Sequence, residues 1–187
     1  MIGVAEDATP LLDALAAEPQ ARLVAIADTD AETATRAAST VGAAVYTDFR
    51  SLIVEEKLDA LVIAAPHFEA QNPLKLAAGR SLPVFKKAPL ARRFDEALRL
   101  TQSFESARTG ECPLVVSRAW PSEPAMEQAA RWLNDSGRPF LVQARVFSCL
   151  SDDLRWRGDS EQAGGGVLLQ DGYETLDMII HWLGMPA

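Results

Sequence analysis

Two residues near the start of the chain could take part in nucleotide binding: Gly3 and Asp28. Gly3 lies in a short apolar run, and Asp28 ends the apolar run 22–27. A dinucleotide site needs glycine after its first strand, where the backbone approaches a pyrophosphate. It also needs an acid about 20 residues later for the ribose hydroxyls. Acids at strand ends also serve as turn or helix-cap residues, so Asp28 keeps both interpretations.

Pro66 and His67 directly follow the strongest strand candidate, the continuous apolar run 59–65 (DALVIAA). Ligands of α/β proteins bind where parallel strands end. We therefore expect Pro66 and His67 to contact a ligand. The alternative is a histidine that faces solvent from the loop after the strand.

The elements that must position these residues alternate along the first part of the chain. Strands are predicted over 22–27, 44–46, 59–65 and 83–86, and helices over 31–41, 49–56, 68–78 and 94–107. Such alternation is typical of βαβ units and a parallel sheet. The fold class is therefore α/β, with a Rossmann-like parallel sheet.

The later part of the chain has a different pattern, with a shift in composition near residues 119–124. A helix is predicted over 122–133, a long strand over 140–150, a polar loop over 151–162 and a helix over 166–183. We expect a Rossmann-like dinucleotide-binding-type domain over 1–119 and a partial, truncated C-terminal α/β domain over 120–187.

Charge and composition exclude several kinds of partner. The 187 residues include 18 lysines and arginines against 26 aspartates and glutamates, a formal net charge of −8. Nucleic acids and anionic membranes need a basic face, so neither is expected as a partner. No apolar stretch is long enough to span a membrane, and no signal peptide is expected. Cys112 and Cys149 fit a cytoplasmic protein with reduced thiols and no metal site.

Four stretches together resemble the Gfo/Idh/MocA (glucose–fructose oxidoreductase / inositol dehydrogenase) family of NAD(P)-dependent oxidoreductases. They are RLVAIADTD, DALVIAAPHFEA, VFKKAPLA and WRGDSEQAGGGVLLQDGYETLD, in the family's order. The resemblance implies NAD or NADP as cofactor, with Gly3, Asp28, Pro66 and His67 at its site. It also implies oxidation of a sugar or cyclitol hydroxyl as the reaction.

The chain departs from the family's phosphate loop and lysine motif. Only Gly3 remains of the glycine pattern, and Glu6 and Asp7 follow it, so cofactor binding is expected to be weak or lost. The family's Glu-Lys-Pro motif reads Lys87-Ala88-Pro89 here. The resemblance implies that Lys87, or Lys86 before it, would handle the proton of the reacting hydroxyl.

The last motif, a glycine run followed by an acid and a histidine on one helix, is also altered. The acid position is Gln170 and the histidine position is Glu174. An active enzyme would use Lys87, Asp171 and Glu174, although Asp171 points about 100° away from Gln170 round a helix. We therefore expect weak or lost catalysis. The alternative is a non-catalytic homologue that binds a partner, and the 140–150 strand predicts a homo-oligomer or a partner subunit.

Overall fold

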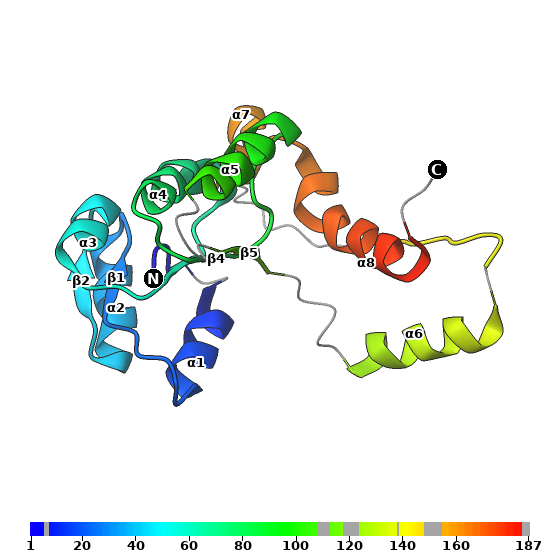
Figure 1. The fold of residues 1–187 in the computed structure, drawn as a ribbon, viewed down its shortest axis with the longest axis horizontal. Helices are drawn as coiled ribbons and strands as arrows, with labels where there is room; N and C mark the ends of the chain where they lie inside the picture. The colour runs from blue at the N-terminus through cyan, green and yellow to red at the C-terminus, as the bar shows by residue number, and fades with distance from the viewer. Residues whose placement is uncertain (6–7, 108–112, 118–123, 138, 148–154, 185–187) are drawn as a thin grey trace. The chain divides into compact units, whose positions relative to one another are not determined.

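The computed structural model describes residues 1–5, 8–107, 113–117, 124–137, 139–147 and 155–184 (Figure 1). The chain divides into two compact units, Met1–Ser117 and Arg118–Ala187. Each unit is described by itself. No helix in the described part is long and apolar enough to cross a membrane.

Short parallel strands form the sheet of the first unit: β1 (Ala25–Ala27), β2 (Ala44–Tyr46), β3 (Leu61–Ile63), β4 (Val84–Lys86) and β5 (Leu114–Val116). Parallel pairs join β1 to β2, β3 to β4 and β4 to β5. Ile2 bridges Ala27 on one side and Ile63 on the other, both in parallel. The spatial order is therefore β2, β1, Ile2, β3, β4, β5, which is the Rossmann order with a switch point between Ile2 and β3.

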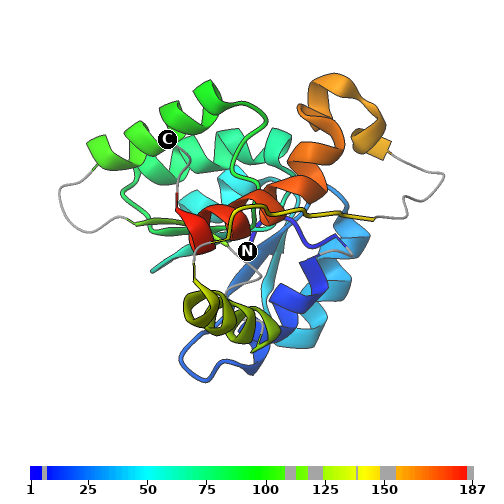
Figure 2. The ribbon, with the colours of Figure 1, turned by 90° about the vertical axis from the view of Figure 1, so that its right-hand side faces the viewer.

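Helices cover both faces of this sheet: α1 (Thr9–Ala17), α2 (Ala31–Val41), α3 (Phe49–Glu55), α4 (His67–Gly79) and α5 (Phe94–Ser106). One apolar cluster joins α3, α4 and α5 to one face, and a second joins α1 and α2 to the other. Figure 2 shows α4 and α5 on one side of the strands and α1 and α2 on the other. Ala25 and Ala27 belong to the first cluster and Ile26 to the second, as alternation along a strand requires. The predicted Rossmann-like α/β fold is confirmed.

Aspartates at the carboxyl ends of β1 and β2 begin the helices that follow them. The Asp30 carboxylate accepts hydrogen bonds from the backbone N–H groups of Glu32 and Thr33. Asp48 accepts one from the backbone N–H of Arg50. These caps satisfy amide groups that have no partner within the helix, so each helix starts directly above the edge of the sheet.

The second unit is helical in its described residues. It contains α6 (Pro124–Ser136), a 3₁₀ turn (Arg155–Gly158), α7 (Ser160–Ala163), a π-helical turn (Leu168–Gly172) and α8 (Tyr173–Leu183). Residues 166–183 are helical throughout, as predicted, and the π turn lies within this helix. A Cβ on Gly165 would lie 2.7 Å from the Leu169 Cβ, and one on Gly172 would lie 2.8 Å from Leu168 Cδ1. Glycine at both positions therefore makes room for the two leucines.

The strand predicted over 140–150 is wrong for its described residues. Residues 140–147 form no regular secondary structure, and 148–150 lie outside the described residues. A strand exists only where a neighbouring strand completes its backbone hydrogen bonds. No strand is assigned to the described residues of the second unit, so the apolar sequence alone does not produce one.

Candidate functional site

A pocket of about 420 Å³ opens at the carboxyl edge of the sheet in the first unit. Residues that directly follow Ile2, β1, β2 and β3 line it, together with one face of α4. Its polar lining includes Asp28, Arg50, Glu69 and Asn72. The pocket therefore lies at the switch point of the sheet, where ligands of doubly wound α/β proteins bind.

Gly3 lies in the wall of this pocket in a conformation that requires glycine. Its φ angle is +79°, in the left-handed region. A Cβ at this position would lie 2.4 Å from the backbone nitrogen of Ala65 and 2.6 Å from its Cα. Because Gly3 has no Cβ, the backbone after Ile2 passes close to Ala65, just beyond the end of β3. This close approach keeps the edge of the sheet closed beneath the pocket.

Asp28 is fixed by two backbone hydrogen bonds. The Val4 N–H donates to its Oδ2 at 2.9 Å, and the Asp30 N–H donates to its Oδ1 at 3.0 Å. A carboxylate offers about four acceptor positions, so roughly two remain for a ligand. Asp28 is thus a turn residue and a pocket residue at once, and the two interpretations of its sequence position are compatible.

The charges in the pocket are mostly negative. Arg50 is the one cation among the described residues that line it, and its guanidinium lies 3.3 Å from Oδ1 of Asp48. Burial, and then the negative charge of Asp28, raise the pKa of the Glu69 carboxyl. The pocket suits hydroxyl donors better than it suits a dense anion.

Pro66 and His67 begin α4 beside this site. Pro66 precedes the first helical turn, and His67 is only 2% exposed, with its ring edge-on to the Phe68 ring. Neither is among the residues that line the pocket. The solvent-facing histidine considered from the sequence is wrong, because the start of α4 is packed against the sheet. A role for Pro66 or His67 in ligand contact stays a prediction.

The two lysines at the carboxyl end of β4 occupy different environments. Lys86, the last residue of β4, is 1% exposed, and its ammonium donates to the backbone carbonyl of Lys87. Lys87 is half-buried and donates its backbone N–H to Ile63 O at 2.9 Å. The Ala88 N–H in turn donates to Ser117 Oγ at 3.0 Å. Lys87 therefore lies at the carboxyl edge of the sheet, on the same edge as the pocket although it does not line it.

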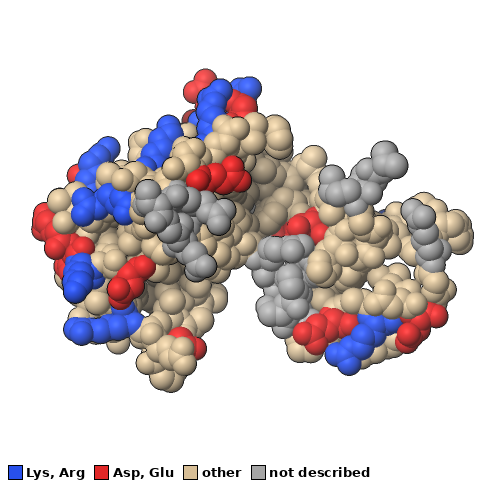
Figure 3. All heavy atoms as spheres, viewed as in Figure 1, with Lys and Arg blue, Asp and Glu red and all other residues tan. Residues whose placement is uncertain are grey.

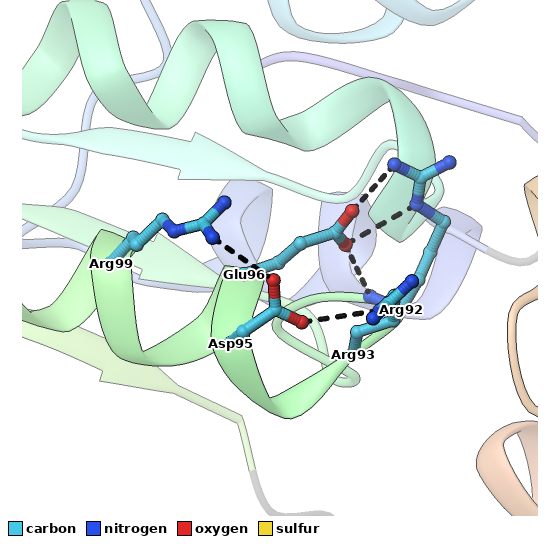
Figure 4. A network of polar contacts seen from close by, with 5 residues as sticks. All are labelled: Arg92, Arg93, Asp95, Glu96 and Arg99. Carbon is cyan, nitrogen blue, oxygen red and sulfur yellow. Dashed lines mark hydrogen bonds and ion pairs between the residues drawn. The ribbon is translucent and has the colours of Figure 1, made fainter.

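An ion-pair network fixes the far end of the loop that carries Lys87 (Figure 4). The Arg92 guanidinium lies 2.6 Å from Oε1 of Glu96, and the Arg92 backbone N–H also donates to Glu96. Arg92 holds the pKa of the Glu96 carboxyl below its usual range. Asp95 lies between Arg93 and Arg99 at 3.1 and 3.3 Å. This arrangement anchors the loop to the first turn of α5.

The second unit holds the remaining predicted catalytic residues. Asp171 lies in the π turn, and Glu174 lies in the first turn of α8, where its Oε1 accepts a hydrogen bond from the Tyr173 hydroxyl at 2.8 Å. Burial and the neighbouring Glu174 raise the pKa of Tyr173. Gln170 Oε1 accepts from Arg157 Nε at 3.1 Å, so this side chain is held by an arginine. A glutamine there cannot take up a proton at neutral pH.

Sequence reasoning missed Glu69 and Asn72 as parts of the pocket. They lie three residues apart and share one face of α4, and Pro73 on the same face also lines the cavity. The spacing alone indicated a shared face. It did not indicate that this face is turned toward Asp28, because that depends on how α4 packs on the sheet.

Relatives of known sequence match most of the first unit. A sequence family described as an oxidoreductase family with an NAD-binding Rossmann fold matches residues 1–110. Inositol 2-dehydrogenase 4 of Saccharopolyspora erythraea is 33% identical over 124 residues, which cover 65% of this chain and 36% of that protein.

Solved structures show the same fold at lower identity. GenD2 from gentamicin A biosynthesis, in complex with NAD, superposes with a TM-score of 0.85 at 20% identity, over 100% of this chain and 53% of that one. A variant of KijD10, a 3-ketoreductase from Actinomadura kijaniata in complex with TDP-benzene and NADP, gives 0.80 at 22% identity, over 98% and 56%. The chain thus spans about half the length of these two structures and about a third of the inositol 2-dehydrogenase relative. On the match over residues 1–110, the chain belongs to the Gfo/Idh/MocA family of oxidoreductases, whose Rossmann domain is of the NAD-binding type.

Proposed function

We propose that the first unit binds a nicotinamide dinucleotide through the pocket at Asp28. The observation that carries this proposal is the Asp28 carboxylate, which two backbone N–H groups fix in the wall of a pocket at the switch point of the sheet. Its remaining acceptor positions suit the two hydroxyls of a ribose. Calorimetric titration with NADH tests the proposal.

The residues present fit the adenosine half of the cofactor better than its phosphates. Gly3 keeps the backbone close to the sheet, as a phosphate loop needs. Glu69, a further carboxylate beside Asp28 and Asp48, opposes a ligand with two phosphate charges. The acids at positions 6 and 7 follow Gly3 in the sequence and lie outside the described residues. We therefore propose binding in the range of tens to hundreds of micromolar.

For the reaction we propose slow oxidation of a sugar or cyclitol hydroxyl, a substrate class that the inositol 2-dehydrogenase relative supports. The bound cofactor supplies the hydride acceptor. Lys87 would manage the proton of the reacting hydroxyl, and Asp171 and Glu174 would contact the substrate. Ala88 and Gln170 carry no proton-transfer group, which supports a low rate.

The second candidate function is binding of another protein chain, with catalysis lost. The described residues of the second unit expose large apolar side chains, with Phe140 fully exposed, Phe147 89% exposed and Leu141 64% exposed. In Figure 3 acidic and basic side chains follow one another along α6 of that unit. Exposed apolar side chains of this number are typical of an interface. We propose a homo-oligomer through residues 140–147.

We also propose that the protein acts in the cytoplasm, since its fold and its NAD-binding type of domain suit a compartment that holds the cofactor. The two cysteines that support this location, at positions 112 and 149, lie outside the described residues. Disruption of the oligomer by replacing exposed phenylalanines with serine and binding of NADH are separate measurements, so the two candidate functions can be tested independently.

A further inference from the structure

Glu69 and Asp28 reach the same pocket from different elements. Asp28 follows β1, and Glu69 lies in the first turn of α4, after β3. The two carboxylates interact, because the charge of Asp28 contributes to the raised pKa of Glu69. Burial is the larger cause of that shift. A ligand in this pocket therefore meets Glu69 besides Asp28 and Asp48.

The charged groups around Glu69 do not neutralise it. On the side of α3, the Arg50 guanidinium is paired with Asp48. On the side of α5, Glu96 is paired with Arg92. The first turn of α4 itself contributes the buried His67, and β3 contributes only the apolar residues Leu61–Ile63. Among the described residues Glu69 forms no ion pair, so its charge acts on whatever occupies the pocket.

We propose that Glu69 determines which dinucleotide the protein accepts, by excluding ligands that carry an additional phosphate beside Asp28. The inference rests on the proposed binding of a dinucleotide and deepens it. A free ribose hydroxyl can donate a hydrogen bond to either carboxylate. A fully ionised 2′-phosphate cannot donate, and it would meet the negative charges of Asp28 and Glu69 in addition to that of Asp48, which is paired with Arg50. The protein therefore binds NADH in preference to NADPH.

Titration of the unmodified protein and of Glu69→Gln with NADH and with NADPH tests this inference. The variant removes one charge and keeps a side chain of similar size. We expect its affinity for NADPH to rise about tenfold, and its affinity for NADH to change less than about twofold. Glu105→Gln is the matched control, because Glu105 is an exposed glutamate at the end of α5, and it should leave both affinities unchanged.

The affinities of both proteins are compared at pH 8. Equal preferences in both proteins at pH 8 overturn the role of Glu69 while leaving the dinucleotide site intact. Failure of the unmodified protein to bind either dinucleotide overturns the site and the role together.

Discussion

The backbone N–H of Val4 donates a hydrogen bond to the Asp28 carboxylate at 2.9 Å. This bond joins the segment that follows Ile2 to the residue that directly follows β1, and the two bonded residues lie 24 positions apart in the sequence. It places the acid against the loop that a dinucleotide's phosphates approach in this fold. The bond thus holds Asp28 against the residue that directly follows Gly3. Gly3 and Asp28 are the two sequence features from which a nucleotide site was first inferred.

Replacing Gly3 with alanine should destabilise the first unit strongly. The new Cβ would overlap the backbone of Ala65, and the φ angle of +79° is strained for any other residue. We expect the free energy of unfolding to fall by at least about 2 kcal/mol in urea denaturation. Gly79→Ala is the control, since a Cβ there meets no atom within 4 Å, and a change below about 1 kcal/mol is expected. Equal effects of the two substitutions would show that the close approach at Gly3 is absent.

When the amino group of Met1 is not acetylated, it makes the free energy of unfolding depend on pH. It is buried and donates to Ala25 O at 2.7 Å, and burial lowers its pKa from 8.0 to about 5. The unfolded chain takes up this proton below pH 8, while the folded chain resists it until about pH 5. Stability should therefore fall as the pH is lowered from 8 to 5, by at most about 4 kcal/mol.

Urea denaturation across this pH range, on the free and the Nα-acetylated protein, measures the effect. Acetylation removes the titrating group, so the acetylated protein should lack this part of the slope. The same slope in both proteins would assign the pH dependence to other groups.

Turnover by the unmodified protein should be very low. Loss of a general acid or base usually lowers a rate by about 10²–10⁴-fold, and we propose from the family resemblance that Ala88, Gln170 and Glu174 replace three such residues. The combined substitution Ala88→Lys, Gln170→Asp and Glu174→His should raise polyol-dependent NADH formation, provided that NADH affinity is unchanged. Vigorous NADH formation by the unmodified protein would contradict this account, and the titration of NADH serves as the control for binding.

Residues 140–147 should mediate self-association. We expect sedimentation of the pure protein at tens of micromolar to show a dimer or larger species, because water-exposed phenylalanines favour burial. Phe140→Ser together with Phe147→Ser should shift the protein to monomers. Phe94→Ser is the matched control, since Phe94 is 83% exposed in the first unit. A monomer in the unmodified protein would rule this interface out.

The sequence predicted the strands of the first unit well because continuous apolar runs are buried on both faces of a parallel sheet. It overestimated their length: the run 59–65 contributes only Leu61–Ile63 as a strand. It failed for the described residues 140–147 of the predicted strand, because apolar composition indicates burial while a strand also needs a partner. It also missed Glu69 as a pocket residue, since the direction in which a face of α4 points is set by packing between elements distant in sequence.

Titration with NADH tests the central proposal most directly. We predict saturable binding with a dissociation constant between about 10 μM and 1 mM. Asp28→Asn should weaken it about tenfold by removing the charged acceptor, and Asp59→Asn, which changes an exposed acid at the opposite end of β3, should leave it unchanged. Absence of binding at millimolar NADH, or equal affinity in the unmodified protein and Asp28→Asn, would contradict a dinucleotide site at Asp28.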